Sequence, residues 1–335
     1  MYGSLLKFTC RKIVPIIAFV LTLSGCQVNR GVSVKTYLNE NGNKNLESLE
    51  IRRGALHFFI IGDWGRNGHF RQKEVADIMH QAGFIIEPEF IISTGDNFYP
   101  DGVASKFDPY LKSSFEDVYS GYNLFCPWFL TLGNHDYRGS VQAQIDYTLI
   151  SRRWNLPARY FELEKPYGKE GEKIQFLFAD TTPFYDPYYS RAGYESVKEQ
   201  DSLAQKNWID NKLSESSATW KIVIGHHPFY TSGRRKNRKS FVKDHLEPLF
   251  EKHKVDLYFA GHEHDLQHLK PKDVTTHHFI SGAGSEVRAS SYGIHSKFAD
   301  SGPGFIIASA LDKVILLQFV NWKGEVIYST EILKD

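Results

Sequence analysis

Short runs of apolar residues recur along the chain after residue 55, and most of them end abruptly in a glycine-containing turn with polar residues. The runs cover 56–61, 90–92, 125–132, 174–178, 222–224 and 255–259. Nearly continuous apolar runs of this length are typical of strands that are buried on both faces of a sheet. They predict six strands, parallel in the early part of the chain.

Two stretches between these runs have helical spacing. Val75, Met79 and Ala82 are spaced to share one face, and Gly83 is placed to end that helix. A second amphipathic stretch covers 204–213, where Ala204, Trp208, Ile209 and Leu213 are the apolar positions. The runs at 305–311, 314–320 and 326–328 are separated by short turns, which predicts antiparallel hairpins. The pattern indicates an α/β fold in one domain over 55–335.

The N-terminal segment has a different pattern. Three basic residues precede an apolar run at 13–23, which is short for a membrane span and is typical of a secretory signal. The run ends in Leu23-Ser24-Gly25-Cys26, which resembles the lipobox of bacterial lipoproteins. We therefore expect a signal peptide over 1–25, a lipid anchor on Cys26 and a flexible tether over 26–54. An uncleaved membrane anchor, or a chance cysteine in a signal peptide, is the alternative.

Removal of this segment changes the charge of the chain. The 335 residues carry 40 lysines and arginines against 39 acidic residues, and the segment takes away three basic residues and no acidic one, which leaves 37 against 39. A balance this close to zero gives no electrostatic argument for a nucleic-acid partner. Three cysteines exclude a disulfide framework, and only Cys126 would remain as a free thiol.

Candidate metal ligands stand at the ends of five predicted strands. The motifs are Gly62-Asp63-Trp64-Gly65, Gly95-Asp96-Asn97-Phe98-Tyr99, Gly133-Asn134-His135-Asp136, Gly225-His226-His227-Pro228 and Gly261-His262-Glu263-His264. Ligands collect at the carboxyl ends of parallel strands, because the loops there meet at one edge. Carboxylate and amide oxygens with imidazoles suit iron, zinc or manganese, and the absence of cysteine argues against a structural zinc site. Each motif alone is weak, but their order and placement together predict a metal site.

This ordered set resembles the calcineurin-like metallophosphoesterase superfamily. Tyr99, three residues after Asp96, is similar to the purple acid phosphatases, and the segments at 142–145, 261–269 and 280–284 resemble their small, tartrate-resistant members. The resemblance runs from about residue 56 to the C-terminus. It implies a four-layer fold, in which two mixed β-sheets are flanked by helices.

The resemblance also implies a dinuclear centre. A ferric ion would be held by Asp63, Asp96, Tyr99 and His264, and a second divalent ion (Fe, Zn or Mn) by Asp96, Asn134, His226 and His262. A bridging carboxylate sets two ions roughly 3.5–4 Å apart, so that both act on one phosphoryl group. A phenolate donates strongly to ferric iron and would give a purple colour. A ferric ion makes water acidic enough to attack as hydroxide at low pH.

Three further residues are expected to act on the substrate. His135 follows a ligand and would protonate the leaving group or hold the phosphate, with a structural partnership to Asp136 as the alternative. His227 is expected in a similar role, although a packing role is nearly as well supported. Related enzymes carry one more histidine after the fourth motif; this chain has a basic segment at 234–239 instead, from which Arg235 is the candidate phosphate ligand.

The sequence therefore predicts an exported, lipid-anchored acid phosphatase of the cell envelope, with outer-membrane sorting suggested by Gln27. Its substrates would be small phosphomonoesters, with phosphoproteins as further candidates. One alternative is a phosphodiesterase or nucleotidase with a manganese or zinc pair, and another is a surface lipoprotein that binds phosphate or metal without catalysis. The tyrosine-rich segment 183–200 stands where related enzymes carry a loop over the site.

Overall fold

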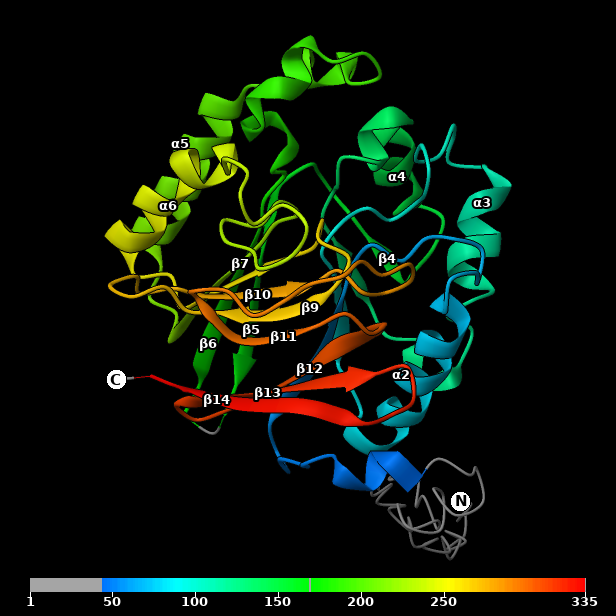
Figure 1. Cartoon of the computed structure of the whole chain (residues 1–335), viewed down its shortest axis with the longest axis vertical. Helices are drawn as coiled ribbons and strands as arrows, with labels where there is room; N and C mark the ends of the chain where they lie inside the picture. The colour runs from blue at the N-terminus through cyan, green and yellow to red at the C-terminus, as the bar shows by residue number, and fades with distance from the viewer. Residues whose placement is uncertain (1–43, 169, 335) are drawn as a thin grey trace, which may run out of the picture.

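Two β-sheets lie at the centre of the molecule, with helices on both outer sides (Figure 1). The computed structural model describes residues 44–168 and 170–334. The predicted signal peptide, Cys26 and most of the predicted tether lie outside these residues. Among the described residues, no helix is both long and apolar enough to cross a membrane.

The first sheet contains the strands that the apolar runs predict at both ends of the chain. Its order is β14-β13-β12-β1-β2-β3-β4, in which β1 to β4 are parallel and β12 to β14 form antiparallel hairpins. The strands are β1 (Leu56–Ile61), β2 (Phe90–Ser93), β3 (Trp128–Leu130), β4 (Trp154–Asn155), β12 (Gly304–Leu311), β13 (Val314–Asn321) and β14 (Val326–Leu333). The predicted change from parallel to antiparallel pairing is confirmed.

The second sheet has the order β11-β9-β10-β8-β7-β6-β5. Its strands are β5 (Phe161–Tyr167), β6 (Glu172–Phe178), β7 (Trp220–Ile224), β8 (Leu257–Ala260), β9 (Leu266–Leu269), β10 (His277–Ser281) and β11 (Ser296–Asp300). Strands β6, β7, β8 and β10 are parallel, and β5 and β9 join them as antiparallel neighbours. Both sheets are thus mixed.

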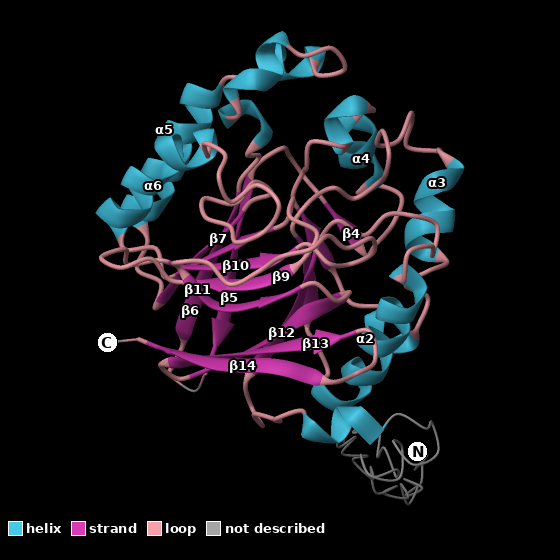
Figure 2. Ribbon diagram, viewed as in Figure 1, coloured by secondary structure: helices cyan, strands magenta, loops and turns pink. Residues whose placement is uncertain are grey.

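The helices complete a four-layer arrangement (Figure 2). They are α2 (Gln72–Ile86), α3 (Pro109–Leu111), α4 (Val141–Tyr147), α5 (Ser202–Glu215) and α6 (Phe241–His253). Short turns occupy Lys44–Ser48, Lys112–Glu116, Tyr122–Leu124, Asp136–Arg138, Thr182–Phe184, Asp186–Ser190 and Glu195–Glu199. Apolar residues of α2, α3 and α4 pack with the first sheet, and those of α5 and α6 pack with the second. The expected fold of two mixed sheets flanked by helices is confirmed.

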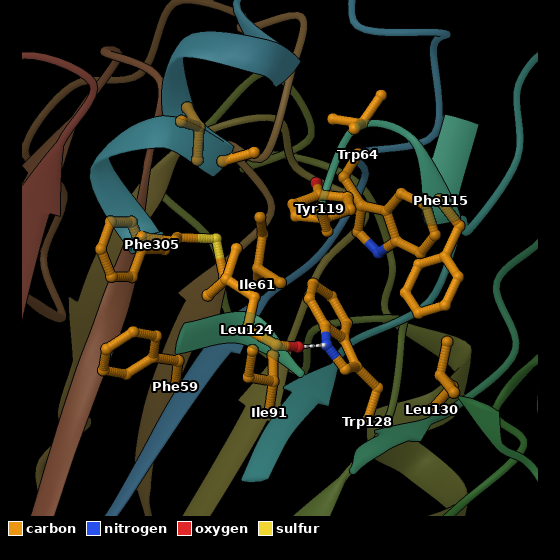
Figure 3. Close-up of a cluster of buried hydrophobic side chains, with 14 of the residues drawn as sticks. Phe59, Ile61, Trp64, Ile91, Phe115, Tyr119, Leu124, Trp128, Leu130 and Phe305 are labelled. Atoms are coloured by element: carbon orange, nitrogen blue, oxygen red, sulfur yellow. Dashed lines mark hydrogen bonds between the residues drawn. The ribbon is translucent and has the colours of Figure 1, made fainter. Parts of the chain in front are cut away.

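The core holds the loops that follow β1 and β2 in place. Trp64 directly follows Asp63 and is completely buried, with its ring 5.5 Å from that of Phe98 and 6.2 Å from that of Trp128. Figure 3 shows Trp64 and Trp128 among the other apolar side chains of this cluster. Because burying aromatic side chains contributes several kcal/mol, the backbone beside Asp63 and Asp96 is fixed from behind.

Residues 44–54 form part of the packed unit, which the expected boundary at residue 55 leaves out. Leu46 and Leu49 are buried. The Glu50 N–H donates to the Gln318 side chain at 2.8 Å, and the Gln318 amide donates back to the Glu50 carbonyl at 3.0 Å. Two spaced leucines in a polar segment are enough to anchor it against β13.

Candidate metal centre

The five strand-end motifs meet at one edge of the two sheets. They follow β1, β2 and β3 in the first sheet and β7 and β8 in the second. Three candidate ligands, Asp63, Asp96 and His262, have left-handed backbone conformations, with φ of 57°, 51° and 69°. Such conformations cost about 1–3 kcal/mol each outside glycine and gather at functional sites.

Glycines beside these ligands make room for them. A Cβ atom on Gly133 would lie 2.2 Å from a carboxylate oxygen of Asp96, and one on Gly261 would lie 2.4 Å from a carboxylate oxygen of Asp63. Both distances are shorter than any non-bonded contact allows. The glycines of the motifs are therefore required by the close approach of the carboxylates.

Four of the candidate ligands converge on the Tyr99 hydroxyl. Its oxygen lies 2.7 Å from Asp63 Oδ1, 2.9 Å from Asp96 Oδ2 and 3.1 Å from His264 Nε2. A phenol has one proton to donate, so it cannot serve both carboxylates at once. The structure thus brings together the four side chains that the resemblance assigns to the ferric ion.

Asp96 connects this group to the second one. Its Oδ2 atom lies 3.3 Å from His226 Nε2, which in turn lies 3.2 Å from His262 Nδ1. His226 Nδ1 lies 2.9 Å from the Thr94 carbonyl, which can only accept, so this nitrogen carries the proton. His226 Nε2 is therefore the nitrogen that can bind a metal.

Asn134 completes the second group. Its Oδ1 atom is buried and has no hydrogen-bond partner among the described residues, while its Nδ2 atom donates to the Tyr194 hydroxyl at 3.4 Å. An unsatisfied buried carbonyl is costly, and a cation would satisfy it. The orphaned oxygen is the observation that best fits a metal ion at this place.

The charges of the site also favour cations. Asp63 and Asp96 are buried beside each other, and burial, assisted by the Asp96 charge, raises the pKa of Asp63 to about 7. Oxygen and imidazole ligands around two shared carboxylates suit iron, zinc and manganese. The residues present therefore fit the dinuclear centre that the fold family implies.

His135 lies beside the ligands and faces away from Asp136. Its backbone N–H donates to Asp96 Oδ1 at 2.7 Å, and its ring lies 4.4 Å from that of Tyr99. Its Nδ1 atom pairs with the Pro100 carbonyl, which leaves Nε2 for the substrate. The alternative partnership between the His135 side chain and Asp136 is absent among the described contacts, because the Asp136 carboxylate accepts from other groups.

His227 lies close enough to His226 and His262 for all three to hold an ion, since their ligand atoms lie within 4.8 Å of one another. The Thr181 hydroxyl oxygen accepts from the His226 and His227 backbone N–H groups, so its own proton is directed to His227 Nδ1 at 2.9 Å. Neutral His227 then carries its proton on Nε2. This tautomer suits a donor to phosphate oxygen.

Arg235 lies in a cavity that His227 and His262 also line. Its guanidinium donates to the His262 carbonyl at 2.9 Å and lies 3.3 Å from the buried Glu263 carboxylate. These contacts hold the basic segment against the loop that carries the candidate ligands. The structure thus places Arg235 beside the site, as the sequence predicts.

Three supporting residues were missed by the sequence analysis. Asp136 accepts from the backbone N–H groups of Gly133 and Asn97 at 2.8 and 3.0 Å, and so joins two ligand loops. Thr181 supports both histidines after β7, and Tyr194 orients Asn134. Thr181 does follow a strand, β6, but no glycine marks that strand end, and Tyr194 comes from a segment without a motif.

The tyrosine-rich segment 183–200 covers the edge of the site. Tyr188 and Tyr194 are buried and their rings stack at 4.1 Å. The Tyr188 hydroxyl lies 3.4 Å from His227 Nε2. The segment therefore contributes to the walls of the site through direct contacts.

Comparisons with known proteins agree with this geometry. Residues 56–266 match the family model described as calcineurin-like phosphoesterase. Purple acid phosphatase 17 of Arabidopsis thaliana is 35% identical, over 82% of this chain and 83% of the relative. Human tartrate-resistant acid phosphatase type 5 is 29% identical, over 83% and 91% of the two chains. A solved structure, titled GAP50, the anchor in the inner membrane complex of Plasmodium, is 28% identical, covers 84% and 90% of the chains, and has a TM-score of 0.74. The chain belongs to the calcineurin-like phosphoesterases, and its curated relatives place it with the purple acid phosphatases.

Proposed function

We propose that this protein is an exported acid phosphatase that hydrolyses phosphate monoesters at a centre of Fe(III) and a second divalent ion. The observation that supports this most strongly is the convergence of a phenol, two shared carboxylates and a histidine on one point, beside an orphaned amide oxygen. When bound, the two ions would activate water and stabilise the charge on the phosphoryl group.

The chain's own residues supply the remaining chemistry. His135 Nε2 is directed to the substrate and would give a proton to the leaving oxygen. His227 Nε2–H would donate to a phosphate oxygen, and Arg235 would add positive charge at the cavity side of the site. Thr94 and Thr181 hold His226 and His227 in the tautomers that these roles require.

Purification with metal analysis and a visible spectrum tests the proposal. We expect iron, a charge-transfer band and turnover of p-nitrophenyl phosphate at acidic pH. Tyr99→Phe should remove the band, because the phenolate is its source. A colourless, iron-free preparation that is active on bis-p-nitrophenyl phosphate would indicate the phosphodiesterase alternative instead.

The non-catalytic alternative is kept in the same experiment. The structural neighbour GAP50 is titled as an anchor, so a protein of this fold can be described by a structural role. Full metal loading without turnover of any monoester would identify this chain as a binding protein.

The proposal places the enzyme in the cell envelope on a lipid attached to Cys26. Labelling with radioactive palmitate in a bacterial host tests the anchor, and Cys26→Ser should abolish the label. Label that persists in Cys26→Ser would contradict it.

A further inference from the structure

A cavity of 460 Å³ opens from the candidate metal centre along the basic segment. His227 and His262 form its inner end, and Arg235 lies beside them. A cavity of this size can bury much of a small organic molecule. Because it begins at the ligands, whatever occupies it is joined to the phosphoryl group at the metals.

The walls of the cavity carry an excess of positive charge. They include five lysines and arginines (Arg235, Lys236, Arg238, Lys239 and Lys243) against two acidic residues (Asp244 and Glu263). Both acids are already paired, Glu263 with Arg235 at 3.3 Å and Asp244 with Lys239 at 3.1 Å. Arg238 has no ion-pair partner among the described residues, and Lys243 lies 3.6 Å from Glu247, outside hydrogen-bond distance.

The same cavity offers flat and apolar surface. Tyr185, Pro228, Tyr230 and Ile294 are among its lining residues. The Ile294 side chain is 95% exposed. Tyr185 stacks on His227 at 5.6 Å and 16°, so an aromatic wall starts at the inner end. Aromatic and apolar walls with a few cations are typical of sites that bind a ring with an attached anion.

We propose that this cavity binds the leaving group of the substrate and selects phosphomonoesters in which that group contains a ring and a second anionic group. This inference rests on the proposed monoester hydrolysis at the metals. Water adds to phosphorus, the ester P–O bond breaks, and the leaving oxygen takes a proton. The second anion remains bound to Arg238 and Lys243, and the ring contacts Tyr185 and Ile294.

Adenosine 5′-monophosphate and adenosine 3′,5′-bisphosphate provide a matched test, since they differ in the second phosphate alone. We expect kcat/KM to be roughly tenfold or more higher for the bisphosphate, as one to two charge-assisted hydrogen bonds allow. The double variant Arg238→Gln/Lys243→Gln should reduce this preference to about twofold and leave the monophosphate unchanged. The control Lys272→Gln/Lys297→Gln removes two exposed cations outside the cavity and should keep the preference.

Calorimetric binding of the bisphosphate separates this inference from the proposed function. If no monoester is hydrolysed, the proposed function fails, while roughly tenfold weaker binding to the double variant would still support the anion site. Equal preference in wild type and double variant would overturn the inference. A stronger preference for an acidic phosphoserine peptide than for the bisphosphate would overturn its ring component, as would unchanged kcat/KM for the monophosphate in Ile294→Asn.

Discussion

At the scale of single residues, the site depends on side chains that hold the candidate ligands as much as on the ligands. Asn134 presents a bare oxygen because its nitrogen is occupied by Tyr194, whose hydroxyl also accepts from Arg138 Nε at 3.1 Å. His226 presents Nε2 because Thr94 occupies Nδ1. In each case the second atom of a two-ended side chain is fixed, which determines what the first atom can bind.

Tyr194→Phe should weaken binding of the second metal by roughly 10–100-fold, because Asn134 loses the contact that orients it. Equilibrium dialysis with zinc or manganese measures this directly. Tyr189→Phe is the matched control from the same segment, since its hydroxyl donates to the Pro183 carbonyl, away from the ligands. Unchanged metal affinity in Tyr194→Phe would show that Asn134 does not need this contact.

His135→Ala should retain both metals and lower turnover by roughly 10²–10⁴-fold, because the acid for the leaving group is lost. Its side-chain contact is with the Pro100 carbonyl, so removing the ring takes no candidate ligand from the site. Metal content and kcat are measured on the same preparation. Loss of metal together with activity would mean that His135 belongs to the ligands.

At the scale of elements, apolar runs predict buried strands well and polar strands poorly. Strand β1 begins and ends where its run does, and β12 and β13 differ from theirs by a residue. Strands β9 and β10 were missed because His268, His277 and His278 interrupt the apolar pattern, although β10 is buried over most of its length. Such strands are fixed by pairing with distant neighbours, which local sequence does not reveal.

His278 makes β10 sensitive to acid. Its side chain is buried, and neither ring nitrogen has a hydrogen-bond partner among the described residues. Burial, with nearby Lys270 and His277, lowers the pKa of His278 from 6.5 to about 3. The unfolded chain therefore binds a proton below pH 6.5 that the folded chain refuses, so stability falls as the pH drops from 6.5 toward 3.

His278→Phe should remove this loss, because the ring packs near Phe229, Tyr230 and Tyr258 without a titrating group. Between pH 6.5 and 4.5 the wild type should lose about 3 kcal/mol more of its unfolding free energy than the variant. Urea unfolding at both pH values measures the difference. The exposed His69→Phe serves as the control, and parallel pH dependence of His278→Phe and wild type would contradict the account.

At the scale of the whole molecule, the site is a junction between two sheets that the sequence places far apart. The order of motifs predicts the candidate ligands, because each stands at a strand end. It does not predict Tyr194, Thr181 or the cavity along the basic segment, because these arise when segments such as 183–200 and 234–239 fold back over the strand ends. Asp96 lies at the centre of this junction, in contact with Tyr99 from its own loop and with His226 from the second sheet.

Metal removal should therefore loosen the whole molecule, and Asp96 should determine how much. Chelation of the wild type should lower its unfolding free energy by about 3–4 kcal/mol at metal concentrations of 100 to 1,000 times Kd, because bound ions stabilise the folded state alone. Asp96→Asn removes the shared carboxylate charge and relieves its repulsion with Asp63, so the metal-free variant should be at least as stable as the metal-free wild type. Thermal melting with and without chelator measures both effects. A chelator-induced loss as large in Asp96→Asn as in the wild type would show that the two ions do not share this carboxylate.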